Sequence, residues 1–256
     1  MIKYWACPVI TLALLILGSG QLTEYSLKKT YEDTYNAYYD TIGKYSIPDG
    51  FSLNPELSGI PQVPNDQTYV EVNGNIPYFN NQDVTATEPW ISLSQQDHLG
   101  RTQAANAVLS VDLMPADNQL RKDLSEVKPS GWQQANYEFI SNGGWLYNRC
   151  HLIGYQLSGL QDEPNNLITG TRWFNVEGML PFENFVANTI EEEEQLVRYR
   201  VTPIYEGSNL LASGVLMEGF SIDDNGESLQ FNIFVPNRQP GVGIDYSNGD
   251  SWTTYY

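Results

Sequence analysis

The chain is poor in the residues that cross-link a fold or chelate zinc. Its 256 residues include two cysteines and two histidines. Cys7 lies in an N-terminal apolar segment, and if that segment is removed Cys150 is the one cysteine left, which excludes an intramolecular disulfide. Cysteine and histidine ligands are then too few for a tetrahedral structural zinc site. Stability has to come from a hydrophobic core, and a chain of this length is long enough to bury one.

Basic residues are also scarce. Lysine and arginine number 13 against 31 aspartates and glutamates, which gives a formal net charge of −18. This balance argues against a protein that holds nucleic acid by bulk attraction, because non-specific affinity comes largely from cations that neutralise phosphates. The acidic residues gather at 191–194 and 223–227, away from the segments that carry the candidate site.

A long apolar run is missing as well. Residues 6–17 are apolar, follow Lys3 and precede the small residues at 18–20, which is the pattern of an export signal. The run is shorter than the about 20 residues that a membrane-spanning helix needs. Residues 1–20 are therefore predicted to be the signal peptide of a secreted, extracellular protein without stable membrane association. A retained membrane anchor is the alternative.

Residues 21–66 are predicted to form an arm before the main domain, which is expected at 67–256. Within 23–44, apolar and aromatic residues recur at spacings of three and four, which favours an amphipathic helix. Residues 45–66 hold four prolines and show no periodicity, so they are interpreted as an extended linker. The chain shows no internal repeat and no low-complexity tract.

The main domain mixes strand-like and helical patterns, as in an α+β fold. Three late segments separated by turn residues predict an antiparallel meander: 196–205, 210–222 and 229–235. Earlier strands are expected at 68–79, 102–114 and 145–152. Residues 166–188 are expected to be helical, 117–142 partly helical, 156–165 a loop, and the tail from 237 a surface wrap.

The stretch from Gly144 to Glu183 groups residue types that suit phosphodiester hydrolysis. His151 has a side chain whose usual pKa of about 6.5 suits it to take a proton from water at neutral pH. Mg²⁺ prefers a few hard oxygen ligands, and an asparagine carbonyl leaves the ion its full charge to act on a phosphate. Asn175 and Glu183 lie eight residues apart, about two helical turns, on nearly the same side, with Pro181 expected to bend the helix between them.

Three separated segments carry a resemblance. Asn148-Arg149-Cys150-His151 resembles the Asp-Arg-Gly-His signature of the DNA/RNA non-specific endonucleases, which have the ββα-metal fold. In amino-acid sequence, the chain most resembles the secreted streptodornase-type DNases in three segments: DHLGRTQAANAV, NRCHLIGYQL and NNLITGTRWFNVEGMLPFEN. The resemblance spans residues 68–245, and three motifs in the right order make it specific. It implies a ββα-metal nuclease core with a central, mostly antiparallel sheet flanked by helices.

The resemblance also implies roles for four residues of the central stretch. His151 matches the general base, and Asn175 matches the single direct protein ligand of Mg²⁺, for which Mn²⁺ is expected to substitute. Asn166 matches an asparagine that supports the metal and phosphate site. Glu183 matches a carboxylate that holds water belonging to the metal.

Arginines complete the implied site. Arg101 matches an arginine that braces the pentacovalent phosphate, although a surface arginine is the alternative. Arg149 and Arg172 lie inside the motifs and are expected to bind substrate. His98, the other histidine, is interpreted as a loop residue near Arg101, with a second catalytic role as the alternative.

Two residues depart from the family signature. Asn148 replaces its aspartate, which removes a negative charge near the metal. Cys150 replaces its glycine, which raises the question of whether the backbone there tolerates a side chain. A cysteine beside the histidine also suggests a thiol nucleophile, but neighbours on a strand point to opposite faces, so we expect Cys150 to point away from His151.

Taken together, the resemblance implies a secreted, Mg²⁺-dependent, sequence-non-specific endonuclease that hydrolyses DNA and leaves 5′-phosphorylated fragments. RNA remains open as a substrate, because neither the metal nor the base reads the sugar. Weak, salt-sensitive binding is expected from the overall charge. The alternative is an inactive secreted nucleic-acid-binding or adhesion module on the same fold.

Overall fold

The computed structural model describes residues 50–51, 55, 59–116 and 120–254, all within one compact unit, Ile47–Tyr256. The predicted signal peptide at 1–20, the helix within 23–44 and part of the linker lie outside the described residues, so they stay predictions. In the part that is described, no helix combines the length and apolar character needed to cross a membrane.

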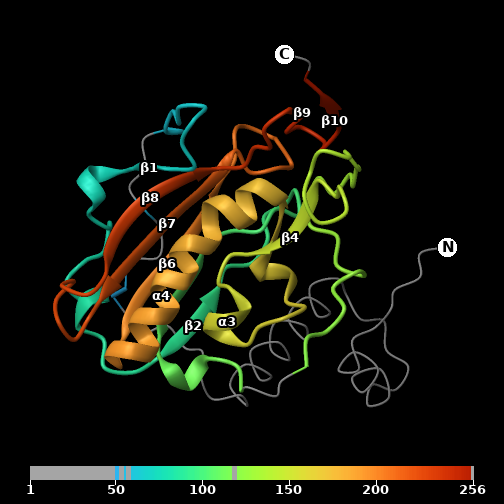
Figure 1. The fold of residues 1–256 in the computed structure, drawn as a ribbon. Helices are drawn as coiled ribbons and strands as arrows, with labels where there is room; N and C mark the ends of the chain where they lie inside the picture. Colours follow the sequence, from blue (N-terminus) through green and yellow to red (C-terminus); the bar gives the residue numbers. More distant parts are fainter. Residues whose placement is uncertain (1–49, 52–54, 56–58, 117–119, 255–256) are drawn as a thin grey trace, which may run out of the picture. The chain divides into compact units, whose positions relative to one another are not determined.

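A six-stranded antiparallel sheet forms the centre of the domain (Figure 1). Its strand order is β1-β8-β7-β6-β3-β2. The strands are β1 (Val70–Glu71), β2 (Trp90–Leu93), β3 (Ala105–Leu109), β6 (Val197–Ile204), β7 (Gly214–Ser221) and β8 (Gln230–Pro236). The last three pair in sequence order, with Val197 opposite Ser221 and Val215 opposite Val235. This confirms the predicted meander and the α+β class.

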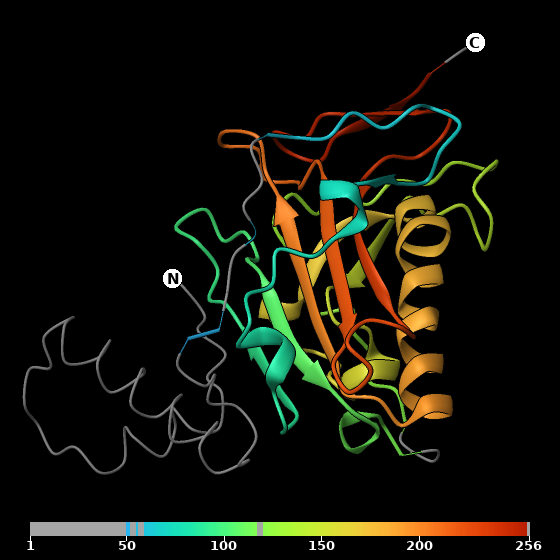
Figure 2. The same ribbon diagram turned by 90° about the vertical axis from the view of Figure 1, so that its left-hand side faces the viewer.

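One long helical path covers a face of this sheet (Figure 2). It begins with a π-helical segment, η5 (Phe174–Met179), and continues as α4 (Leu180–Glu193). Gly178 allows the path to approach β8 closely, because a Cβ there would lie 2.4 Å from Cγ1 of Val235. Further along, the Phe182 and Phe231 rings pack with their centroids 5.2 Å apart. The helix that carries Asn175 and Glu183 is thereby fixed to the sheet.

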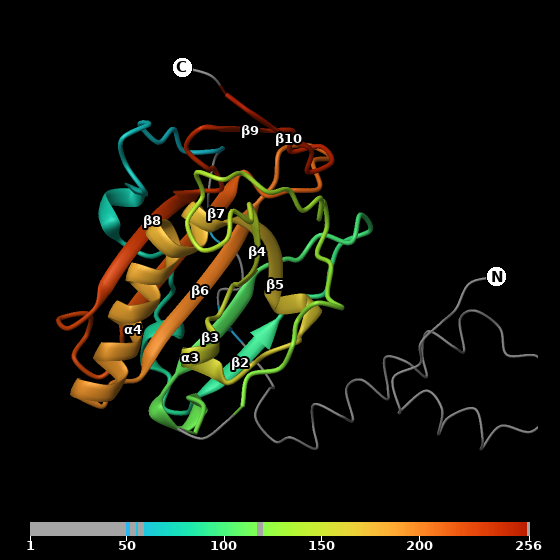
Figure 3. The ribbon, with the colours of Figure 1, turned by 45° about the vertical axis from the view of Figure 1, so that its right-hand side comes forward.

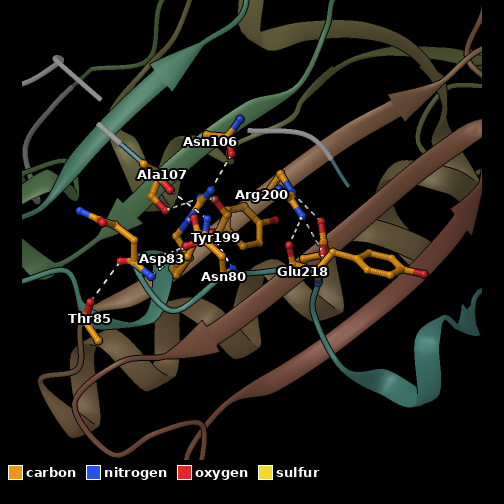
Figure 4. Close-up of polar contacts among 12 residues, drawn as sticks. Asn80, Asp83, Thr85, Asn106, Ala107, Tyr199, Arg200 and Glu218 are labelled. Carbon is orange, nitrogen blue, oxygen red and sulfur yellow. Dashed lines mark hydrogen bonds and ion pairs between the residues drawn. The ribbon is translucent and has the colours of Figure 1, made fainter. Parts of the chain in front are cut away.

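The opposite face of β6 buries two ion pairs (Figure 4). Arg198 Nε lies 2.7 Å from Asp83 Oδ1, and Arg200 Nε lies 2.6 Å from Glu218 Oε2, with all four side chains inaccessible to solvent. Arg198 also donates to the Asn106 side chain. Asp83 belongs to η2 (Asp83–Thr85), so this pair connects the segment that covers the face with the middle of the sheet.

A separate two-stranded hairpin lies beside the helix (Figure 3). Its strands are β4 (Tyr147–His151) and β5 (Leu167–Thr171), with His151 opposite Leu167. Strand β4 confirms the strand predicted to carry His151. The prediction that the helix starts at 166 was wrong for β5, whose five residues are all buried and include three β-branched side chains that suit a strand. The hairpin followed by η5 and α4 makes the ββα unit.

The remaining elements are short. They are the 3-10 turns η1 (Asn73–Asn75), η3 (Val111–Leu113) and η4 (Pro164–Asn166), the helix α3 (Tyr155–Ser158) and a hairpin of β9 (Val242–Ile244) and β10 (Ser251–Thr253). Residues 120–142 form turns without a helix, contrary to expectation, and α3 occupies part of an expected loop. The early strands are shorter than predicted, because η1 interrupts the first and η3 follows the second.

Candidate active site

A cleft of about 480 Å³ opens where the hairpin meets the helix. Its lining includes five of the seven predicted site residues: Arg149, His151, Arg172, Asn175 and Glu183. Asn148 lines the cleft as well. Strand β4 and one helical path therefore bring the predicted histidine, asparagine and carboxylate to one place, although His151 and Glu183 lie 32 positions apart in the sequence.

His151 is oriented by a single hydrogen bond. Its Nε2 lies 2.8 Å from the carbonyl oxygen of Gln161. Since a carbonyl only accepts, we assign the proton to Nε2, which leaves the lone pair on Nδ1. Burial lowers the pKa of His151, the charge of Arg121 lowers it further, and the bond to Gln161 opposes both. The imidazole is therefore neutral at pH 7 and has one nitrogen able to accept a proton.

Asn175 stands in the first turn of η5 with its side chain in the cleft. Within the described residues no hydrogen bond engages its carboxamide, whereas its backbone carbonyl accepts from the Leu180 N–H five residues later. Pro181 falls in the first turn of α4, where its missing N–H is tolerated. The expected disturbance at Pro181 thus lies next to a π-helical segment, a feature that often marks functional sites. Asn175 and Glu183 still line the same cleft, as their spacing predicted.

Glu183 is a partly buried carboxyl that no described residue pairs with. Its carboxyl carbon lies against Gly154, where a Cβ would approach it to 3.1 Å. Burial raises the pKa of Glu183 to about 8. A nearby cation would favour its charged form. Glu183 therefore lies where a bound metal ion would lower its pKa and favour the carboxylate form.

These donors fit a hard divalent ion. The cleft offers a neutral carboxamide oxygen from Asn175 and a carboxylate from Glu183, both unengaged by described residues. Clusters of three or more His, Cys, Asp or Glu that could hold a metal do not occur in the part of the chain that is described. Mg²⁺ binds through few protein oxygens while keeping several waters, so this sparse donor set suits it better than zinc.

Asn166 does not reach the cleft. Its side chain is fully buried, accepts a hydrogen bond from the Ile153 N–H at 2.9 Å and donates to the Ile153 carbonyl at 3.0 Å. Its own carbonyl accepts from the Leu152 N–H. Both ends of the side chain thus hold the turn that follows His151. Any effect on the site passes through that turn.

Arg101 is also outside the cleft. Its Nε pairs with Asp97 at 2.7 Å, and its Nη1 donates to the carbonyls of Gly207 and Asn209. The guanidinium lies 4.6 Å from the centroid of the Tyr205 ring. It is a largely buried brace between loops and neither a surface arginine nor a cleft residue. His98 is exposed and does not line the cleft.

The two motif arginines differ in how far they are engaged. Arg149 donates through Nε and Nη2 to the carbonyls of Val127 and Ser125, and it stacks 4.2 Å from a ring centroid of Trp132. Arg172 donates through Nε to Ser141 Oγ at 3.0 Å. Both terminal nitrogens of Arg172 have no partner among the described residues, whereas in Arg149 only Nη1 has none, so Arg172 is the motif arginine with more donors left for a ligand.

Cys150 occupies a pocket in the hairpin. It is fully buried, and a Cβ on Gly170 would lie 2.4 Å from its Sγ. Gly170 has no side chain, and this leaves room for the side chain of Cys150, which stands where the family signature has a glycine. Burial raises the pKa of the Cys150 thiol well above its usual range, and the residue does not line the cleft. The expectation that it points away from His151 is confirmed, which excludes a thiol nucleophile.

Among the cleft residues that sequence reasoning missed, three have side chains suited to contact a ligand: Arg121, Trp145 and Tyr155. Trp145 is 54 % exposed and lines the cleft; a period-two count back from His151 through β4 would have found it. Tyr155 lies four residues after His151, inside the segment NRCHLIGYQL, but was given no role there. Arg121 lies 30 positions before His151 in a segment without periodicity, so no sequence signal points to it.

Known proteins share this fold. Residues 81–222, more than half of the chain, match the model of the DNA/RNA non-specific endonuclease family. NucA from Streptococcus agalactiae with magnesium ion bound is similar at 27% identity and a TM-score of 0.64, over 73% of this chain and 87% of that one. Sda1 nuclease with bound zinc ion is similar at 30% identity and a TM-score of 0.56, over 64% and 81%. With its ββα unit and cleft, the chain belongs to the DNA/RNA non-specific endonuclease family.

Proposed function

We propose that the cleft hydrolyses phosphodiester bonds of DNA without sequence specificity, with His151 as general base and Mg²⁺ held by Asn175. The observation that carries the proposal is the meeting of His151, Asn175 and Glu183 in one cleft, with Nδ1 of the histidine able to accept a proton. The similarity to NucA with magnesium ion bound supports the choice of ion.

His151 performs the proton transfer in this mechanism. Nδ1 takes a proton from the water that attacks phosphorus, opposite the 3′ oxygen that leaves, so the product carries a 5′ phosphate. The Nε2–H bond to Gln161 keeps the ring oriented and stabilises the imidazolium that forms. When bound, the cation supplies positive charge for the phosphate and the leaving oxygen. Asn175 would hold the ion directly and Glu183 would hold a water belonging to it, while Arg172 contacts the nucleic-acid backbone.

The substrate range follows from what the cleft contacts. None of the proposed groups reads a base edge or a ribose hydroxyl, so we extend the proposal to RNA. Because the proposed donors are hard oxygens, Mn²⁺ is expected to replace Mg²⁺. Digestion of matched DNA and RNA, single and double stranded, with each ion tests both extensions.

Secretion is part of the proposal and rests on the N-terminal pattern alone. A charged start, an apolar run and small residues predict removal of residues 1–20 on export. The mass of the protein recovered from the culture medium would test this. Recovery of the protein in the cell membrane fraction, with a mass that retains the first 20 residues, would favour the anchor.

The decisive experiment removes the base and the metal ligand one at a time. His151→Ala and Asn175→Ala are expected to lower plasmid cleavage by about 10²- to 10⁴-fold, the usual range for a general base and an electrostatic contribution. His98→Ala is the matched control, because His98 is exposed and outside the cleft. Plasmid nicking in Mg²⁺ and in chelator, on proteins with unchanged circular dichroism, makes the measurement.

Undiminished cleavage by either variant would refute the role assigned to that residue. Nucleic-acid binding by the wild-type protein without cleavage in Mg²⁺ would support the alternative, an inactive binding module. The departure at Asn148 makes this comparison worthwhile, since the cleft has one carboxylate fewer than the family signature implies.

A further inference from the structure

Arg121 is a cation of the cleft that no described residue neutralises. Its side chain is exposed and makes no hydrogen bond or ion pair with the described part of the chain. The guanidinium carbon lies 4.3 Å from the centroid of the Tyr155 ring, and both residues line the cleft. Arg101 and Arg149, by contrast, are engaged by carboxylate or carbonyl groups.

The segment around Arg121 is anchored to the one that orients His151. The Lys122 N–H donates to Oε1 of Gln161, and Lys122 Nζ pairs with Asp162 at 2.8 Å. Gln161 Nε2 in turn donates to the Leu120 carbonyl. Since the Gln161 carbonyl accepts the His151 Nε2–H, the position of Arg121 is coupled to that of the imidazole.

Tyr155 gives the guanidinium a platform. It begins α3 directly after Gly154, the residue against which the Glu183 carboxyl packs. An arginine that lies over an aromatic ring gains a cation–π contact without using any of its N–H donors. The fork of a guanidinium matches two oxygens of a phosphate. Arg121 is therefore held in place and keeps its donors.

We propose that Arg121, stacked on Tyr155, binds the phosphate that is cleaved, on the His151 side of the cleft. This assigns to Arg121 the phosphate contact that the resemblance implied for Arg101, whose guanidinium is bound to Asp97 and to two backbone carbonyls outside the cleft. The effect of its charge on His151 supports their proximity. The inference rests on the proposed function and deepens it by naming the residue that grips the reacting group.

The test compares Arg121→Ala with Lys128→Ala. Lys128 lies in the same segment, is exposed and does not line the cleft, so its loss changes the net charge equally. We expect Arg121→Ala to lower kcat/KM on DNA about 10²-fold or more, as for other lost electrostatic donors, and Lys128→Ala to stay within about twofold, as a charge far from the phosphate does. Arg121→Lys should recover only part of the loss, because it restores charge without the fork.

A substrate with one phosphate separates the cleaved phosphate from its neighbours. On an aryl phosphodiester such as bis(p-nitrophenyl) phosphate, the Arg121→Ala defect should persist. A defect confined to long DNA would overturn the proposal, since Arg121 would then bind a flanking phosphate. Tyr155→Phe should retain activity, because it keeps the ring, and Tyr155→Ala should lose part of it. Equal activities of these two variants would show that the ring does not position Arg121 and would contradict the proposal.

A binding measurement keeps this inference distinct from the proposed function. If the wild-type protein cleaves nothing, the proposed function fails. Fluorescence anisotropy of a labelled oligonucleotide in Ca²⁺ still decides the role of Arg121. Arg121→Ala should reduce the slope of log K against log salt by about 0.7 to 0.9, the value of one phosphate contact. An unchanged slope and affinity, equal to those of Lys128→Ala, would overturn the inference.

Discussion

Glu183 is unusual because a carboxyl in a cleft would ordinarily find a donor. No described residue supplies one, and burial raises its pKa to about 8. A folded-state pKa above the unfolded value means that the folded protein keeps a proton that the unfolded chain has released. The associated stability is fully present below about pH 4.5, the unfolded pKa, and is lost as the pH rises through about 8.

This sign gives a prediction for Glu183→Gln. In chelator, raising the pH from 5 to 8 should lower the free energy of unfolding of the wild type relative to Glu183→Gln by a few kcal/mol, since each pKa unit corresponds to about 1.4 kcal/mol. Urea unfolding of both proteins at several pH values measures the difference. His151 contributes equally to both proteins and cancels. Parallel stability curves would contradict the assigned pKa.

At the residue scale, the motifs led to residues that the fold brings together. His151, Asn175 and Glu183 were singled out by residue type, spacing and resemblance, and all three line the cleft, while their roles stay predictions. Arg101 was misplaced because its partners, Gly207 and Asn209, lie more than 100 positions away and have no sequence signature. The partners of a long side chain such as that of Arg101 lie in distant loops, and the sequence does not predict the course of those loops.

At the scale of elements, the hairpin depends on a close contact between its two strands. Cys150 Sγ fills the space that a Gly170 side chain would occupy, and the Phe174 ring borders the same space at 2.6 Å from that Cβ position. A side chain at 170 would therefore overpack the hairpin against the start of the helical path.

Gly170→Ala is expected to destabilise the protein by about 1 to 3 kcal/mol, the usual effect of overpacking. Adding Cys150→Gly removes one of the two clashing groups, so the double variant should be more stable than the sum of the single changes predicts, by about 0.5 kcal/mol or more. Urea titrations of the two single variants and the double variant give this coupling. Strict additivity would contradict direct contact between the positions.

The elements differed in how well sequence predicted them. The meander was predicted because alternation and turn residues mark each of its strands. Strand β5 was missed because the short apolar run of Leu167–Thr171 continues without a break into helical residues, and length alone separates a buried strand from a helix in such a run. The π-helical form of η5 had no visible signal beyond Pro181.

At the scale of the whole molecule, the two faces of the sheet are stabilised differently. One face packs apolar and aromatic residues against α4, while the other buries Arg198 with Asp83 and Arg200 with Glu218. Burial lowers the pKa of Arg198 to about 10, so it remains charged at neutral pH. Removing one member of such a pair leaves a charge without compensation in the core.

Asp83→Ala is accordingly expected to lower the free energy of unfolding by about 3 to 5 kcal/mol. The matched control is Asp162→Ala, which breaks the exposed Lys122–Asp162 pair and should cost less than about 1 kcal/mol. Thermal or urea unfolding of both variants measures the contrast. Equal losses would mean that the buried pair contributes no more than the surface pair.

The molecule has two imidazoles, and the hydrogen bond to Gln161 makes them chemically unequal. An electrophile small enough to enter the cleft would find a nucleophilic nitrogen only at Nδ1 of His151, because Nε2 is occupied by its proton and the carbonyl. Alkylation there would yield a single regioisomer, whereas His98 on the surface would yield a mixture. The hydrogen bond to the Gln161 carbonyl thus determines which nitrogen of the His151 ring reacts, and this selectivity depends on the folded structure.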